Sequence, residues 1–366
     1  MRRAGPAAPR LSTLRRVPGA RRHEGRGRLI ALDAMGGDLA PAATVEGALR
    51  AHRERGLQIV LVGDEKRVRE ELKRHGAGEQ EVRVHHASQV VEMGEHPGKA
   101  LRKKKDSSIR VAFELCKAGQ ARAMVSAGNS GAVLAGGVFV FGRLEHVDRP
   151  CIGGFLPSLG PVGRTVLVDM GANVEVTPLQ LVQFALLGEV YARRVLGIAR
   201  PRVGIVANGE EEGKGTDLTR AAAAALRKPE SGVHFAGYVE GKDVFAGEFD
   251  VIATDGFTGN VLLKTAEGAV WAFGQLLKRQ IQASAMASAG ALLLRSQLEQ
   301  VKKRVDYEEV GGAPLLGVRG VAMIAHGRST PLAILNALSG AEAFAAQHLD
   351  EHLSGAARRG ADLFRT

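Results

Sequence analysis

Short apolar runs that end in a small polar turn occur six times along this chain. In each, a stretch of aliphatic residues leads directly into glycine combined with Asp, Asn, Ser or His. A run of this kind without a polar face predicts a strand buried on both sides, as in a parallel sheet. The six runs and their turns occupy residues 29–38, 123–131, 165–173, 203–209, 250–260 and 320–327.

Helical patterns alternate with these runs. We expect a β-hairpin around Gly160 and Pro161, within residues 155–169. The alternation predicts an α/β fold with a doubly wound, mostly parallel sheet. Ligands of such sheets bind beyond the carboxyl ends of the strands, where the six turns would lie. The chain is therefore expected to assemble one enzyme-like site from its whole length. The main predicted helices are 65–75, 107–118, 178–196 and 216–227.

Composition allows a large core but argues against several classes of protein. Of the 366 residues, 45% are hydrophobic and 4% are aromatic, too few for base-stacking platforms, so nucleic acid is not an expected partner. No run approaches the roughly 20 apolar residues of a membrane-spanning helix. The two cysteines, Cys116 and Cys151, are too few for a disulfide framework or a cysteine-based zinc site. We expect a cytoplasmic protein without a metal site.

The net charge of +11 is concentrated at the start of the chain. Residues 1–28 hold nine arginines and one acidic residue, and so carry eight of these charges. The segment lacks core-forming residues, so we expect a disordered arginine-rich extension. A transit peptide, a phosphate-binding arm and an upstream extension without function are the alternatives. Residues 29–350 would form the α/β domain, followed by a C-terminal tail at 351–366.

One region interrupts the alternation. From residue 259 to about 305 the pattern is helical, and residues 283–294 within it are small, apolar and uncharged. This predicts a protruding helical hairpin with an apolar tip. The hairpin would be buried against a second subunit or inserted shallowly at a membrane surface. The cations available to meet acidic headgroups are Arg279, Arg295, Lys302 and Lys303.

Three of the turns combine glycine with groups suited to an anionic ligand. The backbone N–H groups of a glycine turn or a helix start can approach and bind a negative charge. Asp255 could orient a lysine or accept a proton, or it could cap a helix. The candidate residues are Asp33, Gly36, Gly37, Ser126, Asn129, Ser130, Asp255, Gly259 and Asn260.

A fourth turn, residues 208–217, imitates a nucleotide-binding P-loop but departs from it. Its glycines are one residue too close, and Gly215 stands where a magnesium-binding hydroxyl is required. Lys214 lies between glycines before a predicted helix, where its ammonium could reach a phosphate or a carbonyl oxygen. A solvated loop lysine is the alternative. Asn208 begins this turn. No G-x-G-x-x-G follows the first strand, so no dinucleotide cofactor is indicated.

Further candidates follow from charge and position. The basic run 102–105 comes just before a helix start at Ser107 and Ser108, and cations beside a helix N-terminus favour an anion. Asn173 and His326 follow the two remaining strands. His326 could be a catalytic group or a structural hydrogen bonder. From this set we take Arg102, Lys104, Ser108, Asn173 and His326 as candidate substrate-binding residues.

Seven segments, in the same order, resemble the signature blocks of the bacterial phosphate acyltransferase (acyl-ACP:phosphate transacylase) family. The resemblance covers residues 28–350 and implies a fold related to isocitrate dehydrogenase and phosphotransacetylases. Residues 1–27 lie outside it. Leu39 also departs, because the family often has His or Tyr there. The segments are 33–41, 93–108, 126–132, 169–175, 208–219, 254–268 and 307–329.

The resemblance implies a cofactor-free transfer of a fatty acyl group from acyl carrier protein to inorganic phosphate. Acyl phosphate would then feed phospholipid synthesis through a membrane glycerol-3-phosphate acyltransferase. A cytosolic homodimer that associates peripherally with membrane is implied as well. We hypothesise direct attack by phosphate on the thioester. Lys214, Asn129, Ser130 and Asn260 would contact the reacting oxygens, and Asp255 would hold Lys214 or an amide in place.

Three other functions would use parts of the same sequence. A phosphotransacetylase acting on short-chain coenzyme A thioesters would share fold and chemistry. A basic nucleic-acid-binding protein would depend on residues 1–27, because the rest of the chain is nearly neutral. A non-catalytic membrane adaptor would use the hairpin and leave the six polar turns without a role.

Overall fold

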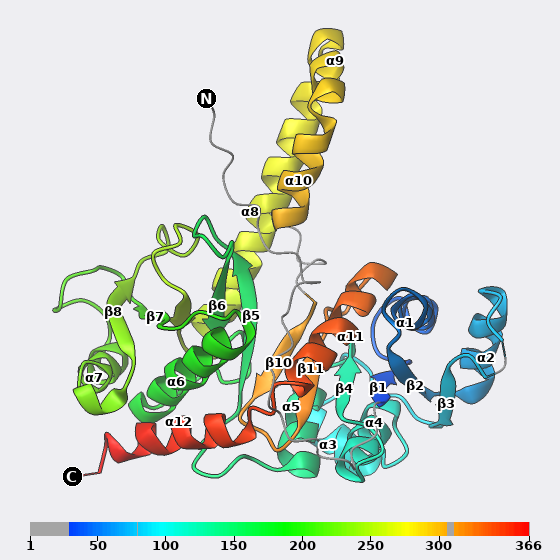
Figure 1. Cartoon of the computed structure of the whole chain (residues 1–366), viewed down its shortest axis with the longest axis horizontal. Coiled ribbons are helices and arrows are strands. Elements are labelled where there is room, and N and C mark those ends of the chain that lie inside the picture. Colours follow the sequence, from blue (N-terminus) through cyan, green and yellow to red (C-terminus); the bar gives the residue numbers. More distant parts are fainter. Residues whose placement is uncertain (1–28, 79, 306–310, 366) are drawn as a thin grey trace.

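A mixed sheet of eleven strands runs through the molecule (Figure 1), in the order β3-β2-β1-β4-β11-β10-β5-β6-β9-β7-β8. The computed structural model describes residues 29–78, 80–305 and 311–365, so the predicted extension at 1–28 lies outside the described residues. The strands are β1 (Leu29–Asp33), β2 (Gln58–Gly63), β3 (Arg83–His86), β4 (Ala123–Ser126), β5 (Cys151–Pro157), β6 (Arg164–Val168), β7 (Arg202–Val206), β8 (His234–Val239), β9 (Val251–Ala253), β10 (Ala313–Leu316) and β11 (Val321–Ile324).

The sheet has two parallel sets of strands that run in opposite directions. Seven of the ten strand pairings are parallel, which confirms the predicted mostly parallel α/β fold. The three antiparallel pairings, β11–β10, β10–β5 and β5–β6, follow one another and reverse the strand direction. We call β1–β4 with β11 the β1 half, and β6–β9 the β6 half. The pairing of β5 with β6 confirms the predicted hairpin at 155–169.

Helices cover both faces of the sheet because alternate strand residues point to opposite sides. In β1, Ile30 and Leu32 belong to the core cluster that includes residues of α1 and α11, whereas Ala31 belongs to the cluster that includes residues of α4 and α5. The helices are α1 (Ala42–Arg55), α2 (Glu65–Arg74), α3 (Pro97–Lys103), α4 (Ser108–Lys117), α5 (Ser130–Gly136), α6 (Pro178–Val195), α7 (Asp217–Leu226), α8 (Gly256–Gln282), α9 (Ala285–Leu293), α10 (Arg295–Val305), α11 (Pro331–Ala345) and α12 (Asp350–Asp362), with short turns η2 (Gly137–Phe141) and η3 (Pro229–Ser231).

Helix starts follow their capping residues closely. The Thr177 hydroxyl accepts a hydrogen bond from the Gln180 N–H at 3.3 Å, and the Gln180 side chain accepts one from the Thr177 N–H at 2.9 Å. This capping box, with Pro178 in the first turn, starts α6 where the sequence predicts it. Predicted helices 65–75, 107–118 and 216–227 appear as α2, α4 and α7, each within one or two residues.

The three helices α8, α9 and α10 form a hairpin that projects from the body (Figure 1). The first turns of α8 are anchored, because Leu262 and Leu263 pack against a core cluster that contains Leu167 of β6. The predicted apolar tip, residues 283–294, is itself largely helical as α9. No described helix is both long enough and apolar enough to cross a membrane.

The segment treated as a C-terminal tail contains a packed helix. The Gln183 side chain of α6 donates to the Ala357 carbonyl of α12 at 3.1 Å. Leu353, Ala356 and Ala357 of α12 are buried in the core cluster shared with α6. Helix α12 thus closes the β6 half beneath α6 (Figure 1).

Candidate functional site

The turns after β1 and β4 meet around the buried carboxylate of Asp33. Its oxygens accept hydrogen bonds from the Ser126 hydroxyl at 2.7 Å and from the Met35 N–H at 3.2 Å. The Ser108 hydroxyl bonds the same carboxylate. Burial raises the pKa of Asp33 and outweighs these hydrogen bonds, which lower it. Asp33, Ser108 and Ser126 are each at most 2% exposed. The structure therefore brings three predicted site residues together, with Asp33 directed at its neighbours in the protein.

Glycine is required where this cluster meets the adjoining turns. A Cβ on Gly36 would lie 2.6 Å from a carboxylate oxygen of Asp33 and 2.8 Å from the Gly128 nitrogen. Gly37 has a φ of +105°, a backbone conformation that residues other than glycine rarely adopt. The next residue, Asp38, donates its N–H to the Gly327 carbonyl at 2.7 Å. The turns after β1, β4 and β11 are thus closely packed together.

Two predicted anion ligands have roles within the protein. The Asn129 amide donates to the carbonyls of Glu92, Met93 and Glu95 at 3.1–3.3 Å, and its oxygen caps α5. The Lys104 ammonium lies 2.6 Å from a Glu95 carboxylate oxygen and 2.7 Å from the Val90 carbonyl. Both side chains hold the 90–95 loop against the β1 half. The sequence could not show this, because the loop carbonyls are backbone groups with no residue signal.

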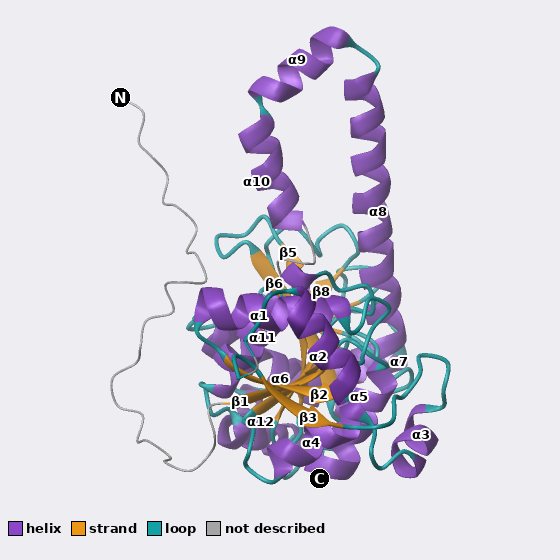
Figure 2. Cartoon of the chain, turned by 90° about the vertical axis from the view of Figure 1, so that its right-hand side faces the viewer, coloured by secondary structure: helices purple, strands orange, loops and turns teal. Residues whose placement is uncertain are grey.

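The neighbouring candidates Arg102 and Ser130 are exposed to solvent. The Arg102 guanidinium lies 4.9 Å from the ring centroid of Phe139, a cation–π contact. Ser130 is the first residue of α5, just after its cap. In Figure 2, α5 and the lower part of α8 lie on the same side of the sheet. Both side chains are accessible from solvent to a ligand or a partner.

In the β6 half, a second buried carboxylate organises the turn after β6. Asp169 is fully buried and accepts five hydrogen bonds, from the N–H groups of Ile152, Gly171, Ala172 and Asn173 and from the Asn173 amide. Burial raises its pKa, while these donors oppose the shift. Asp169 is not among the candidate residues predicted from the sequence. The signal was present, because Asp169 follows β6 just as Asp33 ends β1.

The predicted residues of the β9 turn pack directly on this carboxylate turn. A Cβ on Gly259 would lie 1.9 Å from the Asp169 carbonyl oxygen, so only glycine fits. The Gly256 N–H donates to the Asn173 carbonyl at 2.7 Å. Asn260 is exposed beside Gly171. The structure thus brings together Asn173, Gly259 and Asn260 from two neighbouring strand ends.

Asp255 acts as the N-cap of α8. Its oxygens accept the Thr258 N–H at 2.8 Å and the Thr258 hydroxyl at 2.7 Å. These contacts correspond to the capping alternative of the sequence analysis. No hydrogen bond between Asp255 and Lys214 occurs in the described structure, so the expected orientation of the lysine by this carboxylate is not observed.

Lys214 and Asn208 lie in the exposed loop after β7, at the same end of the sheet as the turns after β6 and β9. The Asn208 side chain accepts the Gly215 N–H at 2.8 Å. Close by, the Lys242 ammonium lies 2.8 Å from oxygens of both Glu210 and Glu240, and these bonds raise its pKa.

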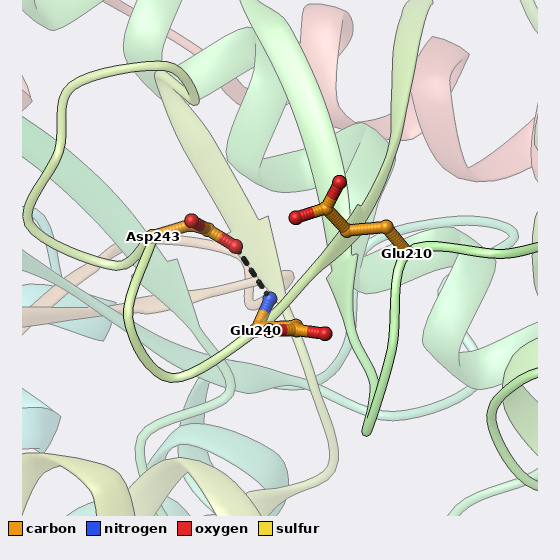
Figure 3. Close-up of side chains that lie close together, drawn as sticks. All are labelled: Glu210, Glu240 and Asp243. Atoms are coloured by element: carbon orange, nitrogen blue, oxygen red, sulfur yellow. Dashed lines mark hydrogen bonds between the residues drawn. The ribbon is translucent and has the colours of Figure 1, made fainter.

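A cluster of carboxylates stands beside this loop. The side chains of Glu210, Glu240 and Asp243 converge, and Asp243 accepts the Glu240 N–H at 3.1 Å (Figure 3). Lys242 supplies the counter-charge for two of them. Three carboxylates disfavour an anion in their immediate vicinity. An anion bound by Lys214 would therefore have to lie away from this cluster.

One polar contact joins the two halves at their turns. The Lys264 ammonium of α8 lies 3.3 Å from Nε2 of His326, which follows β11. Lys264 also pairs with Glu267 at 2.8 Å, and its side chain is 50% exposed. Burial is the main cause that lowers the pKa of His326, and the Lys264 charge adds to it. Lys264 is not among the residues predicted from the sequence, because a charged residue within an amphipathic helix carries no special signal.

Eleven of the sixteen predicted residues therefore fall into three groups. Asp33, Gly36, Gly37, Ser108 and Ser126 form one cluster with the β11 turn nearby. Another cluster contains Asn173, Asp255, Gly259 and Asn260 after β6 and β9. The remaining group, Asn208 and Lys214, is exposed after β7. Each half contributes three of the six turns, and the Lys264–His326 contact links them.

Comparison with known proteins identifies the family. A family model described as fatty acid synthesis protein matches residues 29–351. A phosphate acyltransferase of Anaeromyxobacter sp. (strain Fw109-5) is 57% identical over 328 residues, covering 89% of this chain and 90% of that protein. A phosphate acyltransferase of Geobacter sulfurreducens is 49% identical over 325 residues, covering 89% and 93%.

Solved structures show the fold. A phosphotransacetylase from Streptococcus pyogenes aligns with a TM-score of 0.59 at 16% identity, over 87% of this chain and 94% of that one. A branched-chain phosphotransacylase from Enterococcus faecalis V583 aligns with a TM-score of 0.54 at 13% identity, over 87% and 99%. These likenesses confirm the predicted phosphotransacetylase-like α/β fold. The chain belongs to the phosphate acyltransferase family and is an acyltransferase.

Proposed function

We propose that this chain transfers a fatty acyl group from the thioester of acyl carrier protein to inorganic phosphate. The product is acyl phosphate, a mixed anhydride for phospholipid synthesis. The observation that carries the proposal is the family match, which spans residues 29–351 and therefore all six polar turns. The relatives named phosphate acyltransferase are similar over the same length. The enzyme would act in the cytoplasm.

The reaction needs positioning more than a protein nucleophile. Phosphate is already anionic near pH 7, and a thiol with a pKa of about 8.5 is a good leaving group. Cys151 is fully buried, and burial raises the pKa of its thiol. Cys116 lies eight residues along α4 from Ser108, roughly 12 Å away by helical rise. Direct attack by phosphate on the thioester carbonyl fits these placements.

Donors at the strand ends would hold the reacting oxygens. Lys214, Ser130 and Asn260 are exposed at three of the turns. N–H groups of the glycine turns would add further donors. Asn129 would contribute through the helix start that it caps, since its amide is bound to the 90–95 loop. Removing one donor from such a site typically lowers kcat by a factor of about 10² to 10³.

A turnover assay tests this function. Purified protein would be mixed with long-chain acyl-acyl carrier protein, and thiol release would be measured with and without inorganic phosphate. We expect release only with phosphate, together with acyl phosphate in equal amount. Absence of phosphate-dependent release contradicts the proposal. Lys214→Ala and Asp255→Ser report on two assigned residues, because the serine keeps the helix cap and removes only the carboxylate.

The second candidate is a phosphotransacetylase that acts on acyl-coenzyme A. The fold shared with the Streptococcus pyogenes phosphotransacetylase favours it. The two candidates differ in the carrier of the acyl group. Parallel assays with the same acyl chain on acyl carrier protein and on coenzyme A distinguish them, and we expect the larger kcat/KM for the carrier protein.

Docking of acyl carrier protein would use basic side chains, since this partner is acidic. Arg102, Lys103 and Lys105 are exposed on and after α3, and residues 302–304 are exposed on α10. Raising salt from about 0.1 to 1 M shortens the Debye length from about 10 to about 3 Å. Association measured by stopped flow should therefore slow markedly with salt. A rate that does not change with salt excludes electrostatic docking.

The hairpin would form both a homodimer contact and a lipid contact. In Figure 2, α8 and α10 stand apart, joined by α9. Large apolar side chains along α8 and α10 are exposed, including Trp271 at 68% and Phe273 at 69%. A second copy of the chain could cover this shaft. Met286, Leu292 and Leu293 at the tip are 70–84% exposed and would enter the membrane surface. Peripheral association would bring acyl phosphate to a membrane glycerol-3-phosphate acyltransferase.

A further inference from the structure

A cavity of about 500 Å³ adjoins the turn after β6. Its wall is formed by residues 172–177 of this turn, by Gln180 of α6 and by Arg149, which precedes β5. Because β5 runs antiparallel to β6, the residues before β5 lie beside the turn that follows β6. The Pro150 carbonyl accepts the Asn173 amide at 2.8 Å, and this bond holds the segment with Arg149 to the turn.

The cavity borders the strand-end cluster of the β6 half. Asn173 belongs to both, and its carbonyl accepts the Gly256 N–H at the start of α8 at 2.7 Å. Ala172 in the wall follows Gly171, and a Cβ on Gly171 would lie 3.4 Å from Cβ of Asn260. A ligand that fills the cavity would therefore extend to Asn260, one of the donors proposed for the reacting oxygens.

The wall is close to neutral and mixed in character. Arg149 and Glu175 are exposed and carry its two charges, and neither forms an ion pair with a described residue. Alanine and valine side chains alternate there with amides and a hydroxyl. Pockets of about 300–1,000 Å³ hold small organic molecules, whereas one water occupies only about 30 Å³. The volume and the lining thus fit an organic chain with one anionic group better than inorganic phosphate.

Two side chains in the wall retain hydrogen-bonding capacity. The Asn173 amide nitrogen donates to the Pro150 carbonyl and to Asp169, at 2.8 and 2.9 Å, whereas its oxygen accepts no hydrogen bond from a described residue. The Thr177 hydroxyl accepts the Gln180 N–H at 3.3 Å and gives its own hydrogen to no acceptor in the described part of the chain. One acceptor and one donor remain, and a secondary amide of a ligand needs both.

We propose that this cavity binds the phosphopantetheine arm that carries the acyl group, with Arg149 on the phosphate of the arm. The inference rests on the proposed acyl transfer from a thioester. Such an arm is a chain with two amides, a phosphate group at one end and the thiol at the other. It would lie along residues 172–177, and its thioester would reach Asn260. Acyl carrier protein and coenzyme A end in the same arm, so the cavity accepts either carrier.

The experiment compares two free donors that bear the same acyl chain, acyl-phosphopantetheine and acyl-pantetheine, in the phosphate-dependent thiol-release assay. Arg149→Met should raise the KM for acyl-phosphopantetheine by about 10-fold, because a charged hydrogen bond is lost. The KM for acyl-pantetheine, which lacks the phosphate, should stay within twofold of the wild type. Arg149→Lys, which restores a cation, should recover part of the loss.

A second variant tests the position of the arm. Val174 is 63% exposed in the wall, so Val174→Trp narrows the cavity without entering the core. It should raise the KM for both free donors and leave the KM for inorganic phosphate unchanged. Arg200→Met is the matched control, because Arg200 is exposed before β7, at the opposite end of the parallel strands. It should keep wild-type constants, and melting temperatures should agree among all these variants.

The intact carriers and the free arm complete the test. The wild-type kcat/KM for acyl-acyl carrier protein and for acyl-coenzyme A shows which carrier presents the arm, and Arg149→Met should lower it for the preferred one. Free phosphopantetheine should inhibit that reaction competitively and more strongly than pantetheine. Equal inhibition by the two compounds would contradict a contact between Arg149 and the phosphate.

Two further results overturn the inference. One is an equal effect of Arg149→Met on both free donors, since a structural disturbance does not depend on the phosphate of the arm. The other is Val174→Trp with an unchanged KM for both. Failure of the proposed function looks different, because the wild type itself would then release no thiol from any donor in a phosphate-dependent manner.

Discussion

At the scale of single residues, two buried aspartates organise the turns of the two halves. Asp33 bonds two serine hydroxyls and the N–H groups of Met35 and Gly36, and Asp169 accepts four backbone N–H groups and an amide. Buried N–H groups cost roughly 1–3 kcal/mol each when they lose their partner. The two carboxylates therefore determine the shape of the turns and leave contact with ligand to their neighbours.

The role of Asp169 leads to a stability prediction. Asp169→Ala removes the acceptor for five donors, so we expect a loss of about 3–5 kcal/mol in the free energy of unfolding. Asp169→Asn keeps one acceptor oxygen and should lose less. Urea unfolding of both variants measures this. If alanine cost no more than about 1 kcal/mol, the turn would not depend on the carboxylate.

The lowered pKa of His326 predicts how stability changes with pH. The folded protein disfavours the protonated ring, whereas the unfolded chain takes up a proton near the ordinary value of 6.5. The unfolded state then binds more protons, so this contribution is complete above pH 6.5 and declines as the pH falls below it. His326→Gln should weaken the decline between about pH 7 and pH 5. Urea unfolding at several pH values checks this, and an unchanged pH dependence contradicts it.

At the scale of elements, helix α8 depends on glycine at one position and only tolerates it at another. Gly259 touches the Asp169 carbonyl, whereas Gly268 on the same helix has open space around its Cα. Gly259→Ala should destabilise the protein by about 3 kcal/mol or more, because backbone must move. Gly268→Ala should stabilise it by about 0.5–1 kcal/mol through helix propensity. Thermal unfolding of both variants tests the contrast, which equal effects would refute.

The capping residues explain why elements were predicted well. Thr177, Thr216, Asn129 and Asp255 each accept an N–H from the first turn of the helix that they start. Such signals act within a few residues, so they are legible in sequence. The same locality limits them. Asn129 was predicted to supply an amide to a ligand, but the 90–95 loop, more than 30 residues earlier, uses that amide.

At the scale of the whole molecule, the hairpin separates two proposed contacts along its length. Trp271→Ser with Phe273→Ser should weaken the dimer, because these side chains lie on the shaft. Leu292→Ser with Leu293→Ser should reduce binding to anionic vesicles and leave the dimer intact. Sedimentation velocity and vesicle flotation measure the two properties. A wild type that is monomeric and does not bind vesicles would contradict both proposals.

The sequence by itself determined the features that depend on residues close together along the chain. Apolar runs set the strands, caps set the helices, and glycine turns marked the carboxyl ends where the site is proposed. Asp169 could have been predicted by the same reasoning.

Only the tertiary structure decided how the carboxyl ends of the strands are arranged. The antiparallel strands β10 and β5 reverse the sheet and divide the six turns into two groups of three. The tertiary structure also brings the Ser126 hydroxyl to the Asp33 carboxylate, 93 residues away in the sequence, and the Lys264 ammonium to the His326 ring, 62 residues away. Contacts across such separations depend on the whole folded chain, and no local pattern encodes them.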